Sequence, residues 1–429
     1  MTTLKAVRGT RDLLPPETAL WNRIEATARA VFARYNFGEI RTPVFEDTSL
    51  FARSVGEETD IVSKEMYTWD DRARAQSEKA QSLTLRPENT AGVVRAYIEH
   101  KLGETGQLQK LYYIGPQFRR ERPQKGRYRQ FYQIGAEVIG PPSSGSESPL
   151  RDAEVLEMLA TFLDELGIAG WTLELNSVGS AADRASYNEK LRAALEPLAP
   201  KMCADCQRRA VTNPLRVLDC KVPEDQPLIA TLPAIYDSLG EDSKQHFAAV
   251  TAALDAAGVP YTLNHRLVRG LDYYTRTTFE FTHGGLGAQN ALLGGGRYDG
   301  LSEAIGGPKA PGIGFAMGED RLVLTLLAQA AAAASKVDAY IAPLGEAVGP
   351  AALKLARELR RAGLHIELGD GSFRLKKSFD AADKTARRIV ILGEDELQSG
   401  ILTVKDFASG VQTKVPREEL ARFLSASAN

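Results

Sequence analysis

The chain has 429 residues, 43% of them hydrophobic and 25% charged, and a net charge of −2. These proportions are ordinary for a globular protein of two or three domains, and the charge gives no overall sign of nucleic-acid binding. No apolar run is long enough to span a bilayer, and the first ten residues lack the apolar core of a signal peptide. The sequence therefore predicts a cytoplasmic protein without a membrane segment. Any contact with RNA must come from local basic patches, such as 119–129 and 374–377, and should be sensitive to salt.

Hydrophobic periodicity predicts an amphipathic helix over 17–36. Its apolar face would consist of Leu20, Ile24, Ala28, Val31 and Tyr35. A strand is expected after Pro43, and the segment SLTLRPE reads as a strand that runs into a helix over 90–102, with Thr90 as a plausible N-cap. A flexible loop over 141–149 precedes a helix at 151–167 and a strand at 171–179.

Two β-rich runs, 112–119 and 130–139, flank a strongly basic loop. The basic residues of this loop are Arg119, Arg120, Arg122, Lys125, Arg127 and Arg129. Because strand side chains alternate, Phe131, Gln133 and Glu137 share one face of the second run. The opposite face, expected to be core, carries Tyr132, Ile134, Ala136 and Val138. An aromatic ring, an amide and a carboxylate on an exposed sheet surface beside arginines suit a purine, a triphosphate and a small cationic substrate. Cations this close together need an anion among them.

The remaining chain suggests further domains. From about 180 to 258 it reads as helices with Pro-rich joints, which predicts a helical insertion. The β-rich pattern resumes at 261–282 and ends in a helix over 318–329, and an Ala-rich break at 330–336 is the predicted linker. Residues 337–429 alternate strand and helix, which predicts an α/β domain with a largely parallel sheet.

Three cysteines are too few for a disulfide framework. Cys203 and Cys206 form a CADC motif, with Cys220 further on, and this spacing hints at zinc. No fourth ligand is obvious in the sequence, although His246 stays open. The sequence alone therefore leaves a metal site unknown.

Several segments resemble class II aminoacyl-tRNA synthetases, in the form found in histidyl-tRNA synthetases. FRRE (118–121) and QKGRYRQF (124–131) are similar to motif 2, and LVRGLDYYTRTTFEF (267–281) is similar to the histidine signature. The other similar segments are RGTRDLLP (8–15) at the N-terminus, TPVFE (42–46) as motif 1, LTLRPENTAG (83–92) as the amino-acid-binding loop, GGGRYDGL (294–301), and GIGFAMGEDRL (312–322) as motif 3. Their order and spacing cover nearly the whole chain, so the match is specific.

The resemblance implies an antiparallel-sheet α+β catalytic domain over 1–329, whose insertion contacts the tRNA acceptor arm. It also implies an α/β anticodon-binding domain over 337–429. The implied activity is that of a histidine–tRNA ligase, which joins L-histidine to ATP, with Mg²⁺, to give histidyl-adenylate and pyrophosphate. Histidine then passes to the 3′-terminal ribose of tRNA(His). A homodimer is expected, built on the helix over 17–36 and the strand that follows it.

The resemblance also implies roles for individual residues. Arg119 and Arg269 would be the catalytic cations at the α-phosphate, because an arginine fork binds two phosphate oxygens and stays charged. The histidine site would comprise Glu88, Asn89, Thr90, Arg119, Gln133, Glu137, Arg269, Tyr273 and Tyr274. The ATP site would comprise Arg119, Glu121, Arg127, Phe131 and Arg321. Glu137 and Tyr274 could satisfy the two ring nitrogens of histidine. Asn89 stands where the family usually has glycine, and asparagine tolerates a positive φ best among the alternatives.

Three other functions would leave different marks on the sequence. A non-catalytic paralogue that regulates ATP phosphoribosyltransferase in histidine biosynthesis would usually lack the C-terminal domain and degrade RGLDYY and motif 3. A class II synthetase for another amino acid would not carry LVRGLDYYTRT. A generic ATP-binding protein of the P-loop type would need a GxxxxGK[ST] loop, which this sequence lacks.

Overall fold

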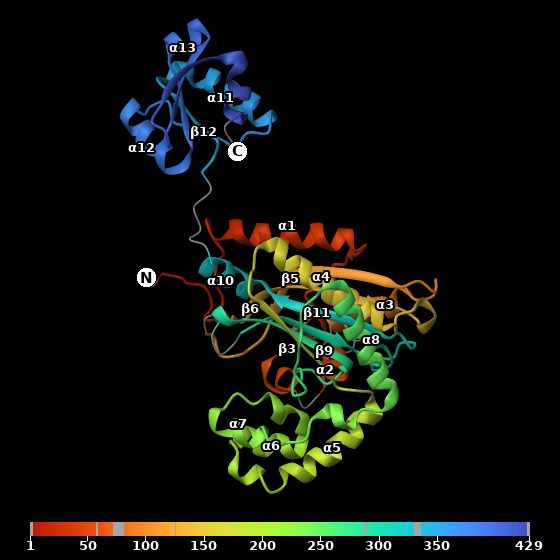
Figure 1. Cartoon of the computed structure of the whole chain (residues 1–429). Helices are drawn as coiled ribbons and strands as arrows, with labels where there is room; N and C mark the ends of the chain where they lie inside the picture. Colours follow the sequence, from red (N-terminus) through yellow and green to blue (C-terminus); the bar gives the residue numbers. More distant parts are fainter. Residues whose placement is uncertain are drawn as a thin grey trace, which may run out of the picture. The chain divides into compact units, whose positions relative to one another are not determined.

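The computed structural model describes residues 3–56, 59–71, 81–124, 126–286, 290–329 and 336–426. The chain divides into two compact units, Met1–Ala331 and Ala332–Asn429 (Figure 1). Lys125 of the basic loop lies outside the described residues, as does the predicted linker except for Lys336. A search of the described helices found none with the length and apolar character needed to cross a membrane.

A mixed sheet of eight described strands forms the centre of the first unit. In spatial order these are β1 (Gly38–Glu39), β5 (Gln109–Phe118), β6 (Gln130–Ile139), β11 (Gly312–Gly318), β10 (Ala291–Arg297), β9 (Thr275–His283), β7 (Trp171–Ser177) and β8 (Thr262–Leu263). All neighbours are antiparallel except the two edge pairs, β1 with β5 and β7 with β8. The predicted antiparallel sheet is confirmed.

Long helices bury one face of this sheet. Helix α1 (Thr18–Arg34) packs on α4 (Pro149–Leu166) and α10 (Glu319–Gln329), and α8 (Glu241–Ala257) packs on α4. The predicted apolar face of α1 is confirmed at Ile24, Ala28 and Val31, which are fully buried, whereas Leu20 and Tyr35 are only partly buried. Because α1 uses its apolar face inside its own chain, amphipathicity alone is no evidence of a dimer.

The side-chain alternation predicted for β6 is confirmed on the core side. Ile134, Ala136 and Val138 are buried in the main core, and Tyr132 packs edge-on against Trp21 with ring centroids 5.5 Å apart. The expectation for the opposite face is wrong at one position. Glu137 is fully buried rather than exposed, because neighbouring strands and aromatic rings cover it.

A smaller sheet consists of β2 (Phe45–Asp47), β4 (Gln81–Leu85) and β3 (Tyr67–Asp71), flanked by α2 (Thr48–Val55). This sheet follows the segment that resembles motif 1. It leaves an apolar patch of Val44, Phe45 and Trp69 partly exposed to solvent, and the rings of Phe45 and Trp69 are 6.0 Å apart.

The predicted insertion contains helices, 3₁₀ turns and connecting loops, with no strand among its described residues. A lobe of α5 (Ala181–Leu195), α6 (Ala204–Thr212) and α7 (Gln226–Ile229), joined by 3₁₀ turns, has a hydrophobic cluster of its own (Figure 1). We call it the helical lobe. Helix α8 lies within the expected range 180–258 but packs into the main core through Phe247, Val250 and Leu254. The lobe that stands apart from the sheet is therefore shorter than the helical stretch of sequence.

The second unit has a five-stranded sheet in the order β13-β12-β14-β15-β16. Its strands are β12 (Ala339–Pro343), β13 (Ile366–Leu368), β14 (Arg388–Leu392), β15 (Ile401–Asp406) and β16 (Gln412–Pro416), and its helices are α11 (Gly349–Arg361), α12 (Leu375–Thr385), α13 (Glu394–Ser399) and α14 (Leu420–Ser425). The first three strands are parallel and the last two are antiparallel. The α/β architecture predicted for this region is confirmed, but the expectation of a largely parallel sheet is wrong, because two of the four described strand pairs are antiparallel.

Candidate active site

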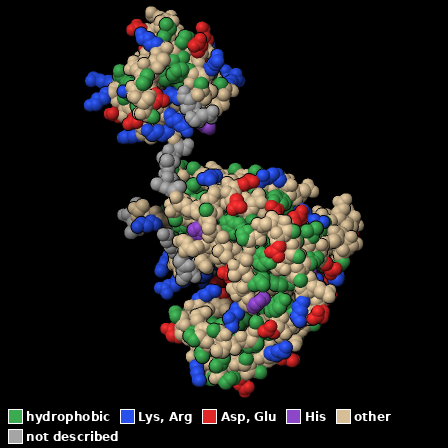
Figure 2. Space-filling view, in the orientation of Figure 1, with side chains coloured by type: hydrophobic (Ala, Val, Ile, Leu, Met, Phe, Trp, Pro, Cys, Tyr) green, Lys and Arg blue, Asp and Glu red, His purple; other side chains and the backbone are tan. Residues whose placement is uncertain are grey.

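A cavity of about 840 Å³ lies between the central sheet and the helical lobe. Figure 2 shows basic and acidic side chains gathered in the hollow between these two parts. The predicted site residues that line the cavity are Glu88, Thr90, Arg119, Glu121, Arg127, Phe131, Gln133, Arg269, Tyr273, Tyr274 and Arg321. The fold thus brings together residues that are up to 233 positions apart in the chain. Asn89 and Glu137 are not among the lining residues.

Glycines on β10 and β11 make room for the site's long side chains. A Cβ on Gly294 would lie 2.5 Å from Cζ of Arg269, and a Cβ on Gly314 would overlap the carboxyl group of Glu137. Side chains meet across strands only where the facing backbone leaves space, so each glycine is required by a close approach and not by its φ angle. The glycine runs in GGGRYDGL and GIGFAMGED therefore shape the cavity floor.

The arginines gather at one end of the cavity, and each is held by the protein. Arg269 forms an ion pair with Glu280, with 3.0 Å between Nη1 and Oε2, and Arg127 forms one with Glu121 at 3.2 Å. Arg119 donates from Nε to the carbonyl of Pro87 at 2.9 Å. Its guanidinium group lies over the ring of Phe131, 5.3 Å from the centroid. We call this the cationic end.

Arg321 completes the cationic end from the first turn of α10. Its Nη1 donates to the carbonyl of Ala291 at 2.6 Å. Burial, together with the charges of Arg127 and Arg269, lowers the pKa of Arg321. A buried arginine whose pKa is lowered by neighbouring cations favours an anionic ligand beside it.

The other end of the cavity is built on the start of helix α3 (Thr90–Glu99). Glu88 accepts hydrogen bonds from the backbone N–H of Thr90 at 2.7 Å and of Ala91 at 3.0 Å. The prediction that Thr90 is the N-cap is wrong, because Asn89 occupies that position and the Glu88 carboxylate binds the free N–H groups. Burial raises the pKa of Glu88 above its ordinary value, although the two N–H groups oppose the shift.

The expectations for Asn89 are wrong for both its backbone conformation and the direction of its side chain. Its φ is −122°, so no positive φ explains an asparagine there. Its side-chain oxygen accepts from the hydroxyl of Thr42 at 2.6 Å, in a buried position behind the cavity wall. Asn89 therefore helps to hold the loop and does not reach the cavity.

Glu137 is buried beneath the cavity. Its Oε1 accepts from the hydroxyl of Thr90 at 2.7 Å. Burial raises the pKa of Glu137 to about 8, and the nearby charge of Glu88 acts in the same direction. Gln133, on the same strand face, has a buried side-chain oxygen with no hydrogen-bond partner among the described residues. We call the region of Glu88, Thr90, Gln133 and Glu137 the carboxyl end.

Two tyrosines of the predicted histidine signature cover the carboxyl end. The rings of Tyr273 and Tyr274 are 4.8 Å apart, and Tyr273 also packs edge-on against Tyr298 at 6.0 Å. Burial raises the pKa of both Tyr273 and Tyr274, so both stay neutral hydrogen-bonding groups. A Cβ on Gly296 would lie 2.9 Å from the ring of Tyr274.

Glu280 and Tyr298 are among the cavity-lining residues that the sequence did not predict. A charged residue between Phe279 and Phe281, in an otherwise apolar strand, was a usable signal for Glu280. Arg297, in the same motif as Tyr298, does not line the cavity and stabilises the fold. It is fully buried and forms ion pairs with Asp152 and with Asp299 at 3.0 Å.

His246 is not near the cysteines. Its Nε2 lies 2.8 Å from Oδ2 of Asp152, next to the main core. The fourth polar group beside Cys203, Cys206 and Cys220 is Asp225.

Comparisons with known proteins show the family of this chain. The family model described as "Histidyl-tRNA synthetase" matches residues 9–322, and the model described as "Anticodon binding domain" matches residues 338–427. The chain is similar to the histidine–tRNA ligase of Koribacter versatilis (strain Ellin345), with 71% identity over 98% of this chain and 96% of that relative. It is also 56% identical to the histidine–tRNA ligase of Solibacter usitatus (strain Ellin6076), over 99% of this chain and 100% of that one.

A solved structure gives the same result. The crystal structure of the apo histidyl-tRNA synthetase of S. aureus matches with a TM-score of 0.78 and 38% identity, over 98% of this chain and 100% of that chain. A family model that covers most of the chain, full-length relatives above half identity and a matching structure all agree. The chain belongs to the histidyl-tRNA synthetases, the class II aminoacyl-tRNA synthetases that ligate histidine to tRNA.

Proposed function

We propose that the cavity carries out both steps of histidine ligation, with ATP at the cationic end and histidine at the carboxyl end. The observation that carries this assignment is the joining of two chemically different ends in one cavity of about 840 Å³. In the first step a carboxylate oxygen of histidine attacks the α-phosphorus of ATP, and pyrophosphate leaves. In the second step the terminal ribose hydroxyl of tRNA(His) attacks the activated carbonyl, and AMP leaves.

The first step concentrates negative charge on the α-phosphate, so fixed cations should dominate its catalysis. We assign this role to Arg119 and Arg269. Both line the cavity, and both are oriented in advance, Arg119 by the carbonyl of Pro87 and Arg269 by Glu280. Groups that are held before the reaction need little rearrangement as charge develops.

The adenine ring would lie on Phe131, next to the Arg119 guanidinium group. Arg321 would cover its other face and reach the γ-phosphate, and Arg127 would contact the terminal phosphates. Glu121 holds Arg127 in an ion pair and would face the exocyclic amine of adenine. The planar forks of these arginines suit phosphate oxygens better than a lysine ammonium would.

At the carboxyl end, Glu88, Thr90 and Gln133 would hold the α-ammonium group of histidine. The buried, unpartnered oxygen of Gln133 needs such a donor. The Tyr274 hydroxyl and Glu137 would bind the two ring nitrogens, with Tyr273 packed beside them. A pocket of this kind rejects amino acids that lack the paired atoms, because its buried polar groups would then lose their partners.

Mg²⁺ fits the cationic end as part of the nucleotide complex. It prefers oxygen ligands and keeps several waters, so phosphate oxygens would supply most of its shell. The ion would neutralise charge on the phosphates of ATP.

The experiment that tests this function is histidine-dependent pyrophosphate exchange, run with each amino acid singly. We expect exchange with histidine alone. Exchange with a different amino acid would reassign the pocket, and no exchange with any would favour the regulatory paralogue. The identity to full-length histidine–tRNA ligases and the intact cationic end both disfavour that paralogue.

The second unit would bind the anticodon arm, and the helical lobe would contact the acceptor arm. Deleting residues from about 336 onward should spare adenylate formation but cripple charging of tRNA(His). If both steps fell equally, the second unit would be a support for the catalytic fold.

We further propose that the protein is a cytoplasmic homodimer. The support for a dimer is the apolar patch of Val44, Phe45 and Trp69, two of which lie in the segment that resembles motif 1. Light scattering at micromolar concentration should give a mass of twice one chain. Phe45→Asp should shift the protein toward the monomer, whereas Leu353→Asp, at an exposed leucine of the second unit, should not.

A further inference from the structure

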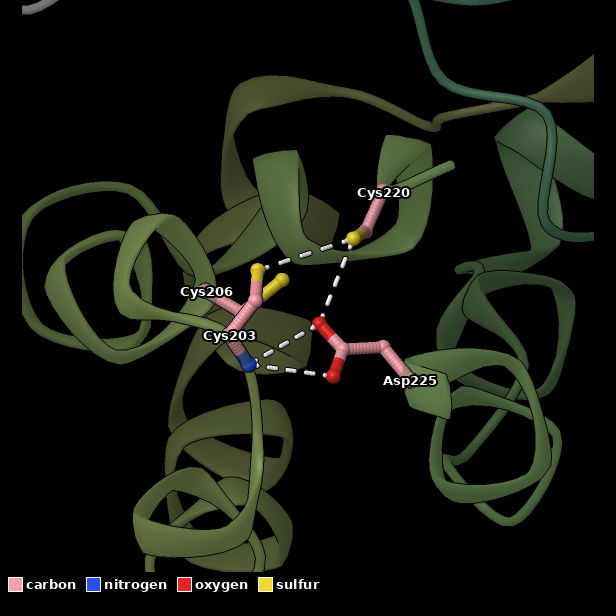
Figure 3. A group of neighbouring side chains, drawn as sticks. All are labelled: Cys203, Cys206, Cys220 and Asp225. Atoms are coloured by element: carbon pink, nitrogen blue, oxygen red, sulfur yellow. Dashed lines mark hydrogen bonds between the residues drawn. The ribbon is translucent and has the colours of Figure 1, made fainter. Parts of the chain in front are cut away.

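Three cysteines and an aspartate come together inside the helical lobe, away from any role in ligation. Cys203 precedes helix α6, Cys206 lies in its first turn, Cys220 follows the 3₁₀ turn Pro214–Asp219, and Asp225 precedes α7. Their ligand atoms all lie within 4.8 Å of one another. Figure 3 shows the three sulfur atoms and the carboxylate directed toward a common centre. All but Cys203 are buried.

The separations fit a tetrahedral zinc ion. Zn–S bonds of ~2.3 Å at the tetrahedral angle put two sulfur atoms about 3.8 Å apart, and a carboxylate oxygen about 3.6 Å from a sulfur. The observed distances are 3.9 Å between Sγ of Cys203 and Sγ of Cys220, and 3.3 Å between Sγ of Cys220 and Oδ2 of Asp225. Little movement would be needed to admit the ion.

Backbone hydrogen bonds already orient two of the four groups. The N–H of Cys203 donates to both oxygens of Asp225, at 3.0 and 3.2 Å, and fixes the plane of the carboxylate. The N–H of Val222 donates to Sγ of Cys220 at 3.4 Å, an arrangement that stabilises a thiolate. Metal sites depend on such second contacts to hold their ligands in position.

We propose that Cys203, Cys206, Cys220 and Asp225 bind a structural zinc ion. Three thiolates select a soft or borderline ion and disfavour Mg²⁺ and Ca²⁺, and four protein ligands leave no open position for catalysis. The ion would link the start of α6 to the loop at Cys220 and to the residue before α7.

The zinc site lies against the cavity wall. Cys220 itself lines the cavity, as do its neighbours Asp219 and Lys221 and the α7 residue Gln226. Gln226 also donates to the carbonyl of Cys220 at 2.6 Å. Because the cysteines fix this stretch, loss of the ion should loosen the wall that faces the substrates while the central sheet stays intact.

The test is the metal content of the full-length chain, purified without an affinity tag or chelator from zinc-supplemented medium. We expect one zinc ion per chain by mass spectrometry. Replacement of the ion by Co²⁺ should give the visible absorption of tetrahedral cobalt–thiolate coordination. Cys206→Ser and Cys220→Ser should each lower the zinc content at least tenfold. Asp225→Asn should weaken retention against a chelator, and Asp225→Cys should restore it.

The matched control is Asp237→Asn, at an exposed aspartate of the same lobe, which should retain the zinc. A wild-type chain that has less than a tenth of an ion and gives no cobalt spectrum would overturn the proposal, whether or not the variants fold. Titration of only one free thiol in that metal-free chain would indicate a disulfide between two of the three cysteines instead.

Discussion

The two ends of the cavity differ in whether their charged side chains form ion pairs. At the cationic end, the guanidinium groups of Arg127 and Arg269 each form an ion pair with a carboxylate. At the carboxyl end, Glu88 and Glu137 have no cation within salt-bridge distance among the described residues, and burial raises the pKa of each.

The difference reflects what each end has to do. Arginines cannot lose their proton, so a buried arginine needs a partner within the protein. A carboxyl group can take up a proton, so its burial without a cation costs less free energy, and it can then bind a ligand that brings hydrogen-bond donors. The cationic end should therefore control the rate of activation, and the carboxyl end should control the affinity for histidine. The predictions below test this division, in order of expected effect.

The largest effect is expected for Arg269→His. Histidine-dependent pyrophosphate exchange should slow by about a hundredfold or more, on the scale of a lost oxyanion-hole donor. The affinities for histidine and ATP should change much less, because the interaction strengthens mainly in the transition state. Arg269→Lys should rescue only in part, because it keeps the charge and loses the fork.

Transfer from preformed histidyl-adenylate to tRNA should suffer less than activation, because the bond that breaks is then at the acyl carbon. The contrary result is a variant whose affinity for histidine collapses while its activation rate survives. Arg269 would then be a binding residue, and the two ends would not divide rate from affinity.

Gly294→Ala should reproduce the Arg269 defect in weaker form. The new Cβ would lie 2.5 Å from Cζ of Arg269, so the guanidinium group must move although nothing chemical is removed. We expect the exchange rate to fall by about tenfold, with a small change in histidine affinity, since misplacement of a catalytic group by about 1 Å is costly. Gly38→Ala is the matched control, because a Cβ there meets nothing within 4 Å. Equal exchange rates for the two variants would show that the close approach of Gly294 to Arg269 does not matter for catalysis.

Glu137→Gln should act on affinity. The amide keeps the shape of the side chain but cannot ionise when histidine binds, so the dissociation constant of histidine should rise by about tenfold, the scale of one hydrogen bond to a charged group. Calorimetry of histidine binding measures this constant. The activation rate at saturating histidine should change by less than the constant does. If the activation rate fell by more than the affinity for histidine, the carboxyl end would not act mainly on affinity.

The smallest effect is a pH dependence of thermal stability without substrate. Because the folded state raises the pKa of Glu137 from 4.5 to about 8, it holds a proton that the unfolded chain has lost in this window. The contribution of Glu137 to stability is thus complete below about pH 4.5 and is lost as the pH rises toward 8. The Tm should fall across this window by roughly a few degrees. Glu137→Gln should flatten the curve relative to Glu104→Gln, at an exposed glutamate.

The sequence by itself determined the family, the central strands and the residues of the cationic end. Strand alternation was enough to separate the core side of β6 from its polar side, because a period of two follows from the backbone alone. The arginines were recognisable as an anion-binding site because cations so close together need an anion among them. Motif order then identified the histidine signature, although the residues lie on segments far apart in the chain.

Tertiary structure alone decided which polar groups are buried and what each one contacts. Nothing local to Glu137 indicates that Gly314 and neighbouring rings would seal it from water, and Asn89 turned away from the cavity because Thr42 lies behind it. Asp225 joined the three cysteines, and His246 did not, because the helical lobe folds on itself while α8 packs on the main core. Burial and pairing are properties of contacts between distant segments, and a local pattern in the sequence carries no record of those contacts.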